Sequence, residues 1–161
     1  MNPTQPPYPT VVEILLVEDN PLDADLTLRA LKRYRLANHV VWVKNGLEAL
    51  DLIFGLTAVS TDPIHHAPKL VLLDLKLPKI DGHEVLRRLK SDPRTKTIPV
   101  VVMTSSHEEA DLLRACQSGS NSYIVKPVDF DNFMEAVRQL GLYWLLLNKS
   151  PTLPQQSPNH D

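Results

Sequence analysis

The chain has 161 residues, of which 43% are hydrophobic and 22% charged, a composition typical of a single globular domain. Its net charge of −2 offers no basic surface for nucleic acid. The longest apolar run, residues 142–147, falls well short of the roughly 20 residues that cross a membrane. A single cysteine, Cys116, cannot form an internal disulfide, so we expect a reducing, cytoplasmic setting.

Prolines are concentrated at both ends of the chain. Of the 14 prolines, four lie in residues 1–10 and three in residues 148–161. Proline lacks an amide hydrogen and disfavours helices and inner strands. We therefore expect flexible tails over 1–10 and 148–161, and one folded domain over 11–147.

Within this domain, short apolar runs typical of buried strands alternate with segments typical of helices. In chain order we expect a strand over 11–17 and a helix over 21–34, a strand over 39–43 and a helix over 47–54, a strand over 70–75 and a helix over 82–90, a strand over 98–104 and a helix over 107–117, and a strand over 122–125 and a helix over 130–147. An irregular connection over 55–68 precedes the third strand.

Several helix ends carry recognisable signals. Asn20 before Pro21 is typical of an N-cap, and Asp129 is expected to cap the last helix. Segments 81–84 and 106–109 have the spacing of capping boxes. Four leucines of the first helix are expected to face inward: Leu22, Leu26, Leu28 and Leu31. Five residues of the last helix are expected in the core: Phe130, Phe133, Met134, Val137 and Leu140.

Five strand–helix units in succession predict an α/β fold with a doubly wound, five-stranded parallel sheet. Binding sites in such sheets lie beyond the carboxyl ends of the strands. The residues at those ends are Glu18 and Asp19, then Asp74, Thr104 and Lys126.

These strand-end residues suit one chemistry. Clustered carboxylates repel each other unless a cation lies between them, and oxygen ligands favour Mg²⁺ or Mn²⁺. Beside such an ion a carboxylate can accept a phosphoryl group, while Lys126 and Thr104 bind its oxygens. Each residue alone is commonly a cap or a turn former. Their joint placement points to a phosphoryl acceptor site.

Four segments carry a family resemblance: VEDN at 17–20, LLDLKLPKIDG at 72–82, VVMTSS at 101–106 and YIVKP at 123–127. Together they resemble the receiver domain of two-component response regulators. The resemblance implies a (βα)5 flavodoxin- or CheY-like fold with the strand order 2-1-3-4-5. It also implies a single-domain response regulator that accepts a phosphoryl group from a sensor histidine kinase and signals through protein contacts. It would catalyse only its own phosphorylation and dephosphorylation.

The resemblance implies roles for individual residues. Asp74 would be the phosphoacceptor and a Mg²⁺ ligand. Asp19 would bind the ion directly, Glu18 through water, and Lys76 through its backbone carbonyl. No other cofactor is expected.

Further roles concern the switch from the unphosphorylated to the phosphorylated state. Thr104 would be the switch hydroxyl and Tyr123 the aromatic switch residue, which turns inward when Thr104 moves. Lys126 would pair with the phosphoryl group. Pro127 would follow a cis peptide bond.

The apolar end of the last helix is expected to be a partner surface: Leu142, Tyr143, Trp144, Leu145, Leu146 and Leu147. We expect a symmetric homodimer through the face of the fourth helix, fifth strand and fifth helix. Alternatively, the C-terminal tail folds back over this surface.

This ending, the segment TSSHEEADLLRA at 104–115 and the long loop before the third strand resemble the Rcp-type response regulators of cyanobacterial phytochromes. The donor implied is a phytochrome histidine kinase.

Alternatives remain open. The protein could pass its phosphoryl group to a histidine phosphotransfer protein, or regulate chemotaxis or motility. A degenerate receiver that only binds partners is disfavoured by the intact set of Asp19, Asp74, Thr104 and Lys126. A phosphatase of the haloacid dehalogenase type is disfavoured, because it needs an acidic residue where Lys76 stands.

Overall fold

The computed structural model describes residues 13–32, 40–55, 67–110 and 121–142. The strands are β1 (Ile14–Val17), β2 (Val40–Val43), β3 (Leu70–Asp74), β4 (Val100–Thr104) and β5 (Asn121–Val125). The helices are α1 (Pro21–Lys32), α2 (Gly46–Phe54), α3 (Gly82–Ser91) and α5 (Phe130–Gln139). Residues 107–110 are also helical, and the rest of the expected fourth helix lies outside the described residues. So do both predicted tails and residues 56–66 of the predicted connection.

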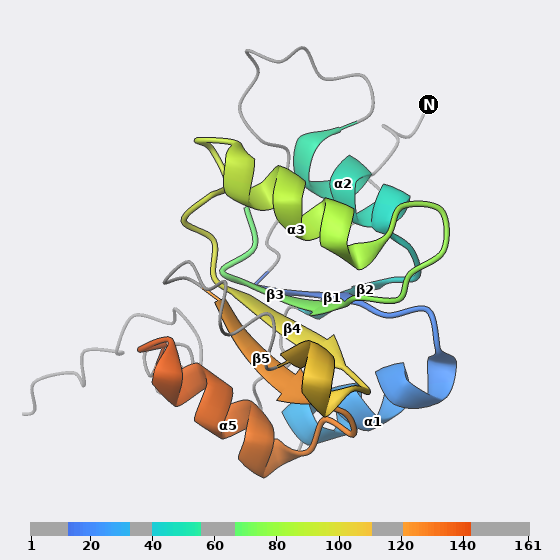
Figure 1. The fold of residues 1–161 in the computed structure, drawn as a ribbon, viewed down its shortest axis with the longest axis vertical. Coiled ribbons are helices and arrows are strands. Elements are labelled where there is room, and N and C mark those ends of the chain that lie inside the picture. The colour runs from blue at the N-terminus through green and yellow to red at the C-terminus, as the bar shows by residue number, and fades with distance from the viewer. Residues whose placement is uncertain (1–12, 33–39, 56–66, 111–120, 143–161) are drawn as a thin grey trace, which may run out of the picture.

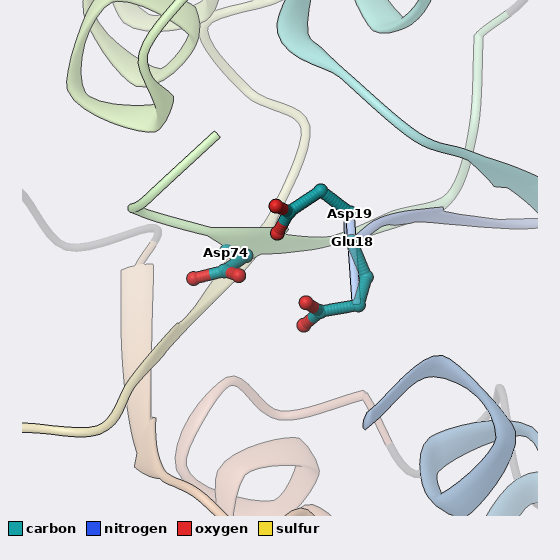
Figure 2. A group of neighbouring side chains, drawn as sticks. All are labelled: Glu18, Asp19 and Asp74. Atoms are coloured by element: carbon teal, nitrogen blue, oxygen red, sulfur yellow. The ribbon is translucent and has the colours of Figure 1, made fainter. Parts of the chain in front are cut away.

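The strands form one parallel sheet in the order β2-β1-β3-β4-β5, which confirms the predicted fold class. Helices α2 and α3 cover one face of the sheet, and α1 and α5 cover the other (Figure 1). In this register Val17 lies beside Leu73. The residues that follow β1 therefore meet the end of β3, which brings Glu18, Asp19 and Asp74 together (Figure 2).

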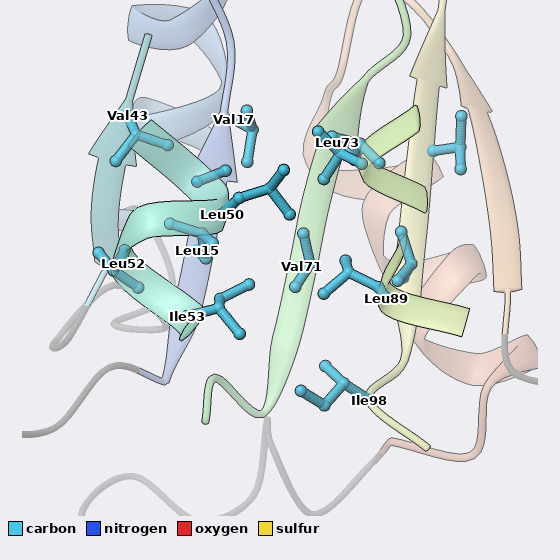
Figure 3. Close-up of a cluster of buried hydrophobic side chains, with 14 of the residues drawn as sticks. Leu15, Val17, Val43, Leu50, Leu52, Ile53, Val71, Leu73, Leu89 and Ile98 are labelled. Atoms are coloured by element: carbon cyan, nitrogen blue, oxygen red, sulfur yellow. The ribbon is translucent and has the colours of Figure 1, made fainter. Parts of the chain in front are cut away.

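Alternation along the buried strands divides the core between the two faces of the sheet. Leu15 and Val17 belong to the cluster beneath α2 and α3, together with Leu50 and Leu89 (Figure 3). Ile14 and Leu16 point to the opposite face of the sheet, where they pack into the second cluster with residues of α1 and α5. Because both faces are covered, β1 has no polar residue between Ile14 and Val17.

Four predicted strand limits are wrong. The first strand begins at Ile14, because Glu13 lies in a bend. The third strand ends at Asp74, one residue early. The fourth begins at Val100, because the chain before it makes a turn in which Ile98 donates to the carbonyl of Thr95. The fifth begins at Asn121, one residue before the predicted start.

The inward face of α1 was predicted correctly for Leu31 and for Leu28, which packs partly buried against the second cluster, but wrongly for the other two leucines. Leu22 is 76% exposed and Leu26 is 49% exposed, whereas Leu31 is buried. The smaller residues Ala24 and Thr27 are buried in their place. A stripe of small residues lets α1 lie close to the sheet, and the helix is rotated so that two of its leucines face outward.

Helix α5 ends earlier than predicted. It stops at Gln139 instead of continuing to residue 147, and Gly141 beyond it has a positive φ of 69°. The amide of Gly141 donates to the carbonyl of Arg138, and the amide of Leu142 donates to that of Val137. These bonds close the helix end, as glycine at this position commonly does.

The early end of α5 changes the interpretation of Leu142. Its side chain is 6% exposed and packs into the cluster on the α1 and α5 side of the sheet. Leu142 is therefore a core residue and not part of a partner surface. The other residues of that predicted surface, 143–147, lie outside the described residues.

The helix starts follow the sequence signals in part. Asn20 Oδ1 accepts hydrogen bonds from the amides of Leu22 and Asp23, which confirms the predicted cap. Asp129 forms a full capping box with Asn132. Asp81 makes no side-chain cap bond, so the box predicted there is wrong, and Glu84 pairs with arginines of its own helix instead.

Among the described residues, no helix is long and apolar enough to span a membrane.

Candidate functional site

Three carboxylates meet at the carboxyl edge of the sheet, where the chain leaves β1 and β3. Ligand oxygens of Glu18, Asp19 and Asp74 all lie within 4.8 Å of one another. Figure 2 shows the three side chains around one space beyond the strand ends. Glu18 and Asp74 are buried, whereas Asp19 is exposed, so the cluster opens to solvent on one side.

Glu18 is fully buried, and hydrogen bonds fix both its backbone and its side chain. Its amide donates to the carbonyl of Val43 at 3.1 Å, and its carbonyl accepts from Nε1 of Trp42 at 2.7 Å. Its Oε1 accepts from the amide of Asn20 at 3.1 Å. Its Oε2 lies 2.8 Å from Lys126 Nζ but lacks the geometry of a hydrogen bond. One buried carboxylate oxygen is thus left with an ionic contact alone.

Burial raises the pKa of Glu18 to about 7. The ion pair with Lys126 works in the opposite direction and lowers this pKa, while the nearby Asp74 carboxylate adds to the rise. A cation between these oxygens would relieve both the desolvation and the repulsion. The donor set is all oxygen and includes an incompletely satisfied buried atom, so these residues fit a hard divalent ion such as Mg²⁺.

Lys126 is the cationic counterpart of this cluster. Its Nζ lies 3.0 Å from Asp74 Oδ2 and 3.1 Å from Asp23 Oδ2, in addition to its contact with Glu18. Its burial tends to lower its pKa, but its interactions with the Glu18 and Asp74 carboxylates outweigh this, and the pKa of Lys126 is raised. The lysine therefore stays charged. The peptide bond between Lys126 and Pro127 is cis, as predicted.

Thr104 stands at the end of β4, beside the first residue after β5: the amide of Lys126 donates to the carbonyl of Thr104 at 2.8 Å. Its hydroxyl accepts from the amide of Ser106 at 3.1 Å and donates to Glu109 Oε2 at 3.2 Å. Glu109 Oε1 in turn lies 3.0 Å from His83 Nε2 on α3. The hydroxyl thus links β4 to the start of the next helix and, through Glu109, to α3.

The remaining predicted site residues lie close by. The amide of Lys76 donates to Asp74 Oδ1 at 3.2 Å, while the residue itself is exposed. Tyr123 is 7% exposed and packs into the cluster beneath α2 and α3. Its ring already lies inward, so its switching role stays a prediction.

Two residues at the site were missed in the sequence analysis. Asp23 binds Lys126, and its position in the first turn of the helix that follows Asp19 is a signal that could have found it. Glu109 was interpreted only as part of a capping box. The amide of Glu109 donates to Ser106 Oγ, as expected for a capped helix start. The Glu109 carboxylate, however, accepts a hydrogen bond from the hydroxyl of Thr104.

Residues 14–138 match the family model described as the response regulator receiver domain. The chain belongs to this family. The receiver fold explains why the acidic cluster, Thr104 and Lys126 lie at one edge of the sheet.

Two curated relatives are similar to this receiver over most of their length. One is "Probable methanogenesis regulatory protein FilR2" of Methanothrix harundinacea, 42% identical over 86% of this chain and 86% of the relative. The other is response regulator Rcp1 of Synechocystis, 36% identical over 88% of this chain and 92% of the relative.

Solved receiver structures are also similar. The bacteriophytochrome response regulator AtBRR is 48% identical with a TM-score of 0.70, covering 84% of this chain and 96% of AtBRR. The Mn²⁺-bound form of Rcp1 is 36% identical with a TM-score of 0.61, covering 85% and 95%. The phosphorylated cyanobacterial phytochrome response regulator RcpA is 35% identical with a TM-score of 0.57, covering 89% and 99%.

Proposed function

We propose that this receiver accepts a phosphoryl group on Asp74 from a phosphohistidine of a sensor histidine kinase. The observation that carries the proposal is the setting of Asp74. Its side chain is 7% exposed, its Oδ2 lies 3.0 Å from a charged lysine, and Glu18 and Asp19 lie beside it. A buried carboxylate with a cation and a divalent-ion site at hand is equipped to carry an anionic group.

The chemistry is a transfer between two nucleophiles. A carboxylate oxygen of Asp74 attacks phosphorus, and the new O–P bond forms as the N–P bond of phosphohistidine breaks. The imidazole keeps the electron pair of that bond and takes up a proton. Lys126 pairs with the oxygens of the transferred group. Asp19, Asp74 and the carbonyl of Lys76 would hold Mg²⁺ directly and Glu18 would hold it through water, and the ion would neutralise charge on those oxygens.

The output is a change of surface. To donate to a phosphoryl oxygen on Asp74, the Thr104 hydroxyl must leave Glu109. Both residues sit at the junction of β4 and the following helix, so the helix start is freed when the bond breaks. We propose that partner proteins detect this change, with Tyr123 of β5 lying beneath the same face.

A phytochrome histidine kinase is our proposed donor. The support is the naming of AtBRR, Rcp1 and RcpA, two of which are called phytochrome or bacteriophytochrome response regulators. With a single cysteine among 161 residues, a reducing cytoplasm suits the chain.

Two further parts of the proposal concern activity and assembly. We propose no turnover of other substrates, so small phosphomonoesters should not be hydrolysed. We also propose a homodimer through the face of the fourth helix, β5 and α5, supported by the apolar sequence over 143–147. Light scattering before and after phosphorylation tests the dimer.

The central test uses the full chain with Mg²⁺ and acetyl phosphate, followed by intact-mass measurement. We expect the mass of one phosphoryl group to be added to the wild type and not to Asp74→Asn. Transfer from purified histidine kinases, among them a bilin-bearing phytochrome kinase under red and far-red light, then tests the donor. Lack of any adduct on the wild type from every donor would refute the function.

A further inference from the structure

The ammonium group of Lys126 contacts three carboxylates at once. Its Nζ lies 2.8 Å from Glu18 Oε2, 3.0 Å from Asp74 Oδ2 and 3.1 Å from Asp23 Oδ2. An ammonium has three N–H donors and no acceptor. Two of these N–H groups donate to Asp74 and Asp23, while Glu18 Oε2 makes an ionic contact without hydrogen-bond geometry. A phosphoryl oxygen that arrives at Lys126 must therefore compete with these three carboxylates for the ammonium group.

Asp23 is the partner that stands on the solvent side. Its side chain is 36% exposed, against 7% for Asp74 and 0% for Glu18. It is also not among the three carboxylates that gather as candidate metal ligands. An incoming phosphodonor therefore meets the charge of Asp23 before it reaches Lys126 and Asp74.

The position of Asp23 is built into the fold. Its amide is held by Oδ1 of the N-cap Asn20 at 3.2 Å, and its carbonyl accepts from the hydroxyl of Thr27 at 2.9 Å. Thr27 is buried at 1% exposure. Asp23, Leu26 and Thr27 face Lys126 and Pro127 across a small hollow of the surface. The carboxylate is thus fixed at the rim of the site instead of moving freely in solvent.

We propose that Asp23 is a specificity-determining residue that disfavours small anionic phosphodonors at Asp74. The inference rests on the proposed function. Asp23 repels a free, highly charged donor, and its hydrogen bond takes up one N–H of Lys126 that could otherwise bind this donor. A kinase-borne phosphohistidine is positioned by its own protein, so the same repulsion is offset by contacts that a small molecule cannot make.

The test compares Asp23→Asn with the wild type in initial rates of Asp74 phosphorylation at saturating Mg²⁺. Two donors are used: acetyl phosphate, and phosphoramidate, which carries less negative charge at neutral pH. We expect Asp23→Asn to react about 3- to 10-fold faster with acetyl phosphate, as expected for removal of one unit charge close to the reacting group. The gain should be smaller with phosphoramidate and should shrink at high salt.

Asp25→Asn is the matched control, because it makes the same charge change on the same helix. Asp25 is 54% exposed and pairs with Arg29 at 2.9 Å. Its rates should equal those of the wild type, and Asp23→Glu should stay slow. Thermal unfolding of each variant shows that the fold is retained.

Three results would overturn the inference. Asp23→Asn could match Asp25→Asn, react more slowly than the wild type, or gain equally with both donors at every salt concentration. The proposed function fails separately: in that case the wild type takes up no phosphoryl group and the inference falls with it. If the wild type is modified on Asp74 and Asp23→Asn changes nothing, only the role of Asp23 is refuted.

Discussion

The hydroxyl of Thr104 donates to the carboxylate of Glu109 at 3.2 Å, five residues further along the chain. This bond ties the predicted switch residue to the start of the following helix. A hydrogen bond to a charged group is worth about 1.5–3 kcal/mol in a protein, and less when its acceptor is partly exposed. Glu109 therefore competes with a phosphoryl group on Asp74 for the same hydroxyl.

Removal of this competitor should favour the activated state. We expect Glu109→Ala to bind beryllofluoride, an analogue of the phosphoryl group, about 5-fold more tightly, since about 1 kcal/mol of competition is lost. Tryptophan fluorescence can follow the titration, because Trp42 donates to the carbonyl of Glu18 at the site. Glu108→Ala is the control, as Glu108 is exposed on the same turn. Equal affinities in the two variants would contradict the competition.

The buried Glu18 should make the metal-free protein less stable as the pH rises. Its pKa is about 7 in the folded state and near 4.5 when unfolded, so between these values only the folded state holds the proton. The free energy of unfolding should therefore fall as the pH rises from about 4.5 to about 7, by no more than about 3 kcal/mol. Chemical denaturation in the presence of a chelator measures this.

Mg²⁺ should reverse the trend, because it binds the ionised carboxylates and competes with the proton. Its stabilising effect should grow as the pH rises through 7. Glu18→Gln should flatten the slope of the metal-free protein. An unchanged slope in Glu18→Gln would show that another group is responsible.

Lys126→Met should destabilise the metal-free protein. It removes the cation from Glu18 and Asp74, and loss of one partner from a buried ion pair costs about 3–5 kcal/mol. Because Lys126 is 15% exposed, we expect about 2–4 kcal/mol near pH 7. The loss should be smaller near pH 5, where Glu18 is protonated and needs no counter-charge. Urea unfolding at the two pH values tests this, and an equal loss at both would argue against the coupling of Lys126 to Glu18.

Gly82 lets the start of α3 approach the end of β3 closely, next to the loop that contains Lys76. A Cβ at this position would lie 2.2 Å from the carbonyl oxygen of Asp74 and 2.6 Å from Cα of Leu75. Its amide also donates to the carbonyl of Leu75 at 3.0 Å. Gly82→Ala should therefore lower the free energy of unfolding by about 1–3 kcal/mol and weaken Mg²⁺ binding.

Gly141→Ala provides the contrast for Gly82. Among the described residues other than its chain neighbours, no atom lies within 4 Å of the Cβ it would add, and its positive φ is the unfavourable feature. It should cost about 1 kcal/mol and leave Mg²⁺ binding unchanged. Isothermal titration with Mg²⁺ separates the two variants, and equal metal affinity in both would contradict the role of Gly82.

The sequence alone was sufficient for the fold class and for the residues at the strand ends. These features follow from local patterns that do not depend on distant parts of the chain. They are the strand and helix periods, the caps Asn20 and Asp129, and the apolar stretch of β1. Strand ends in a parallel sheet meet at one edge, so the meeting of Glu18, Asp19 and Asp74 followed from their places in the chain.

Tertiary structure decided what depends on distant partners. Burial of Ala24 and Thr27 set the rotation of α1 and left Leu22 exposed, since the face of a helix is chosen by what packs against it. The contact of Lys126 with Asp23 joins residues 103 positions apart. The carboxylate of Glu109 also lies 3.0 Å from His83 on α3, 26 positions away, a contact that no local pattern around Glu109 indicates.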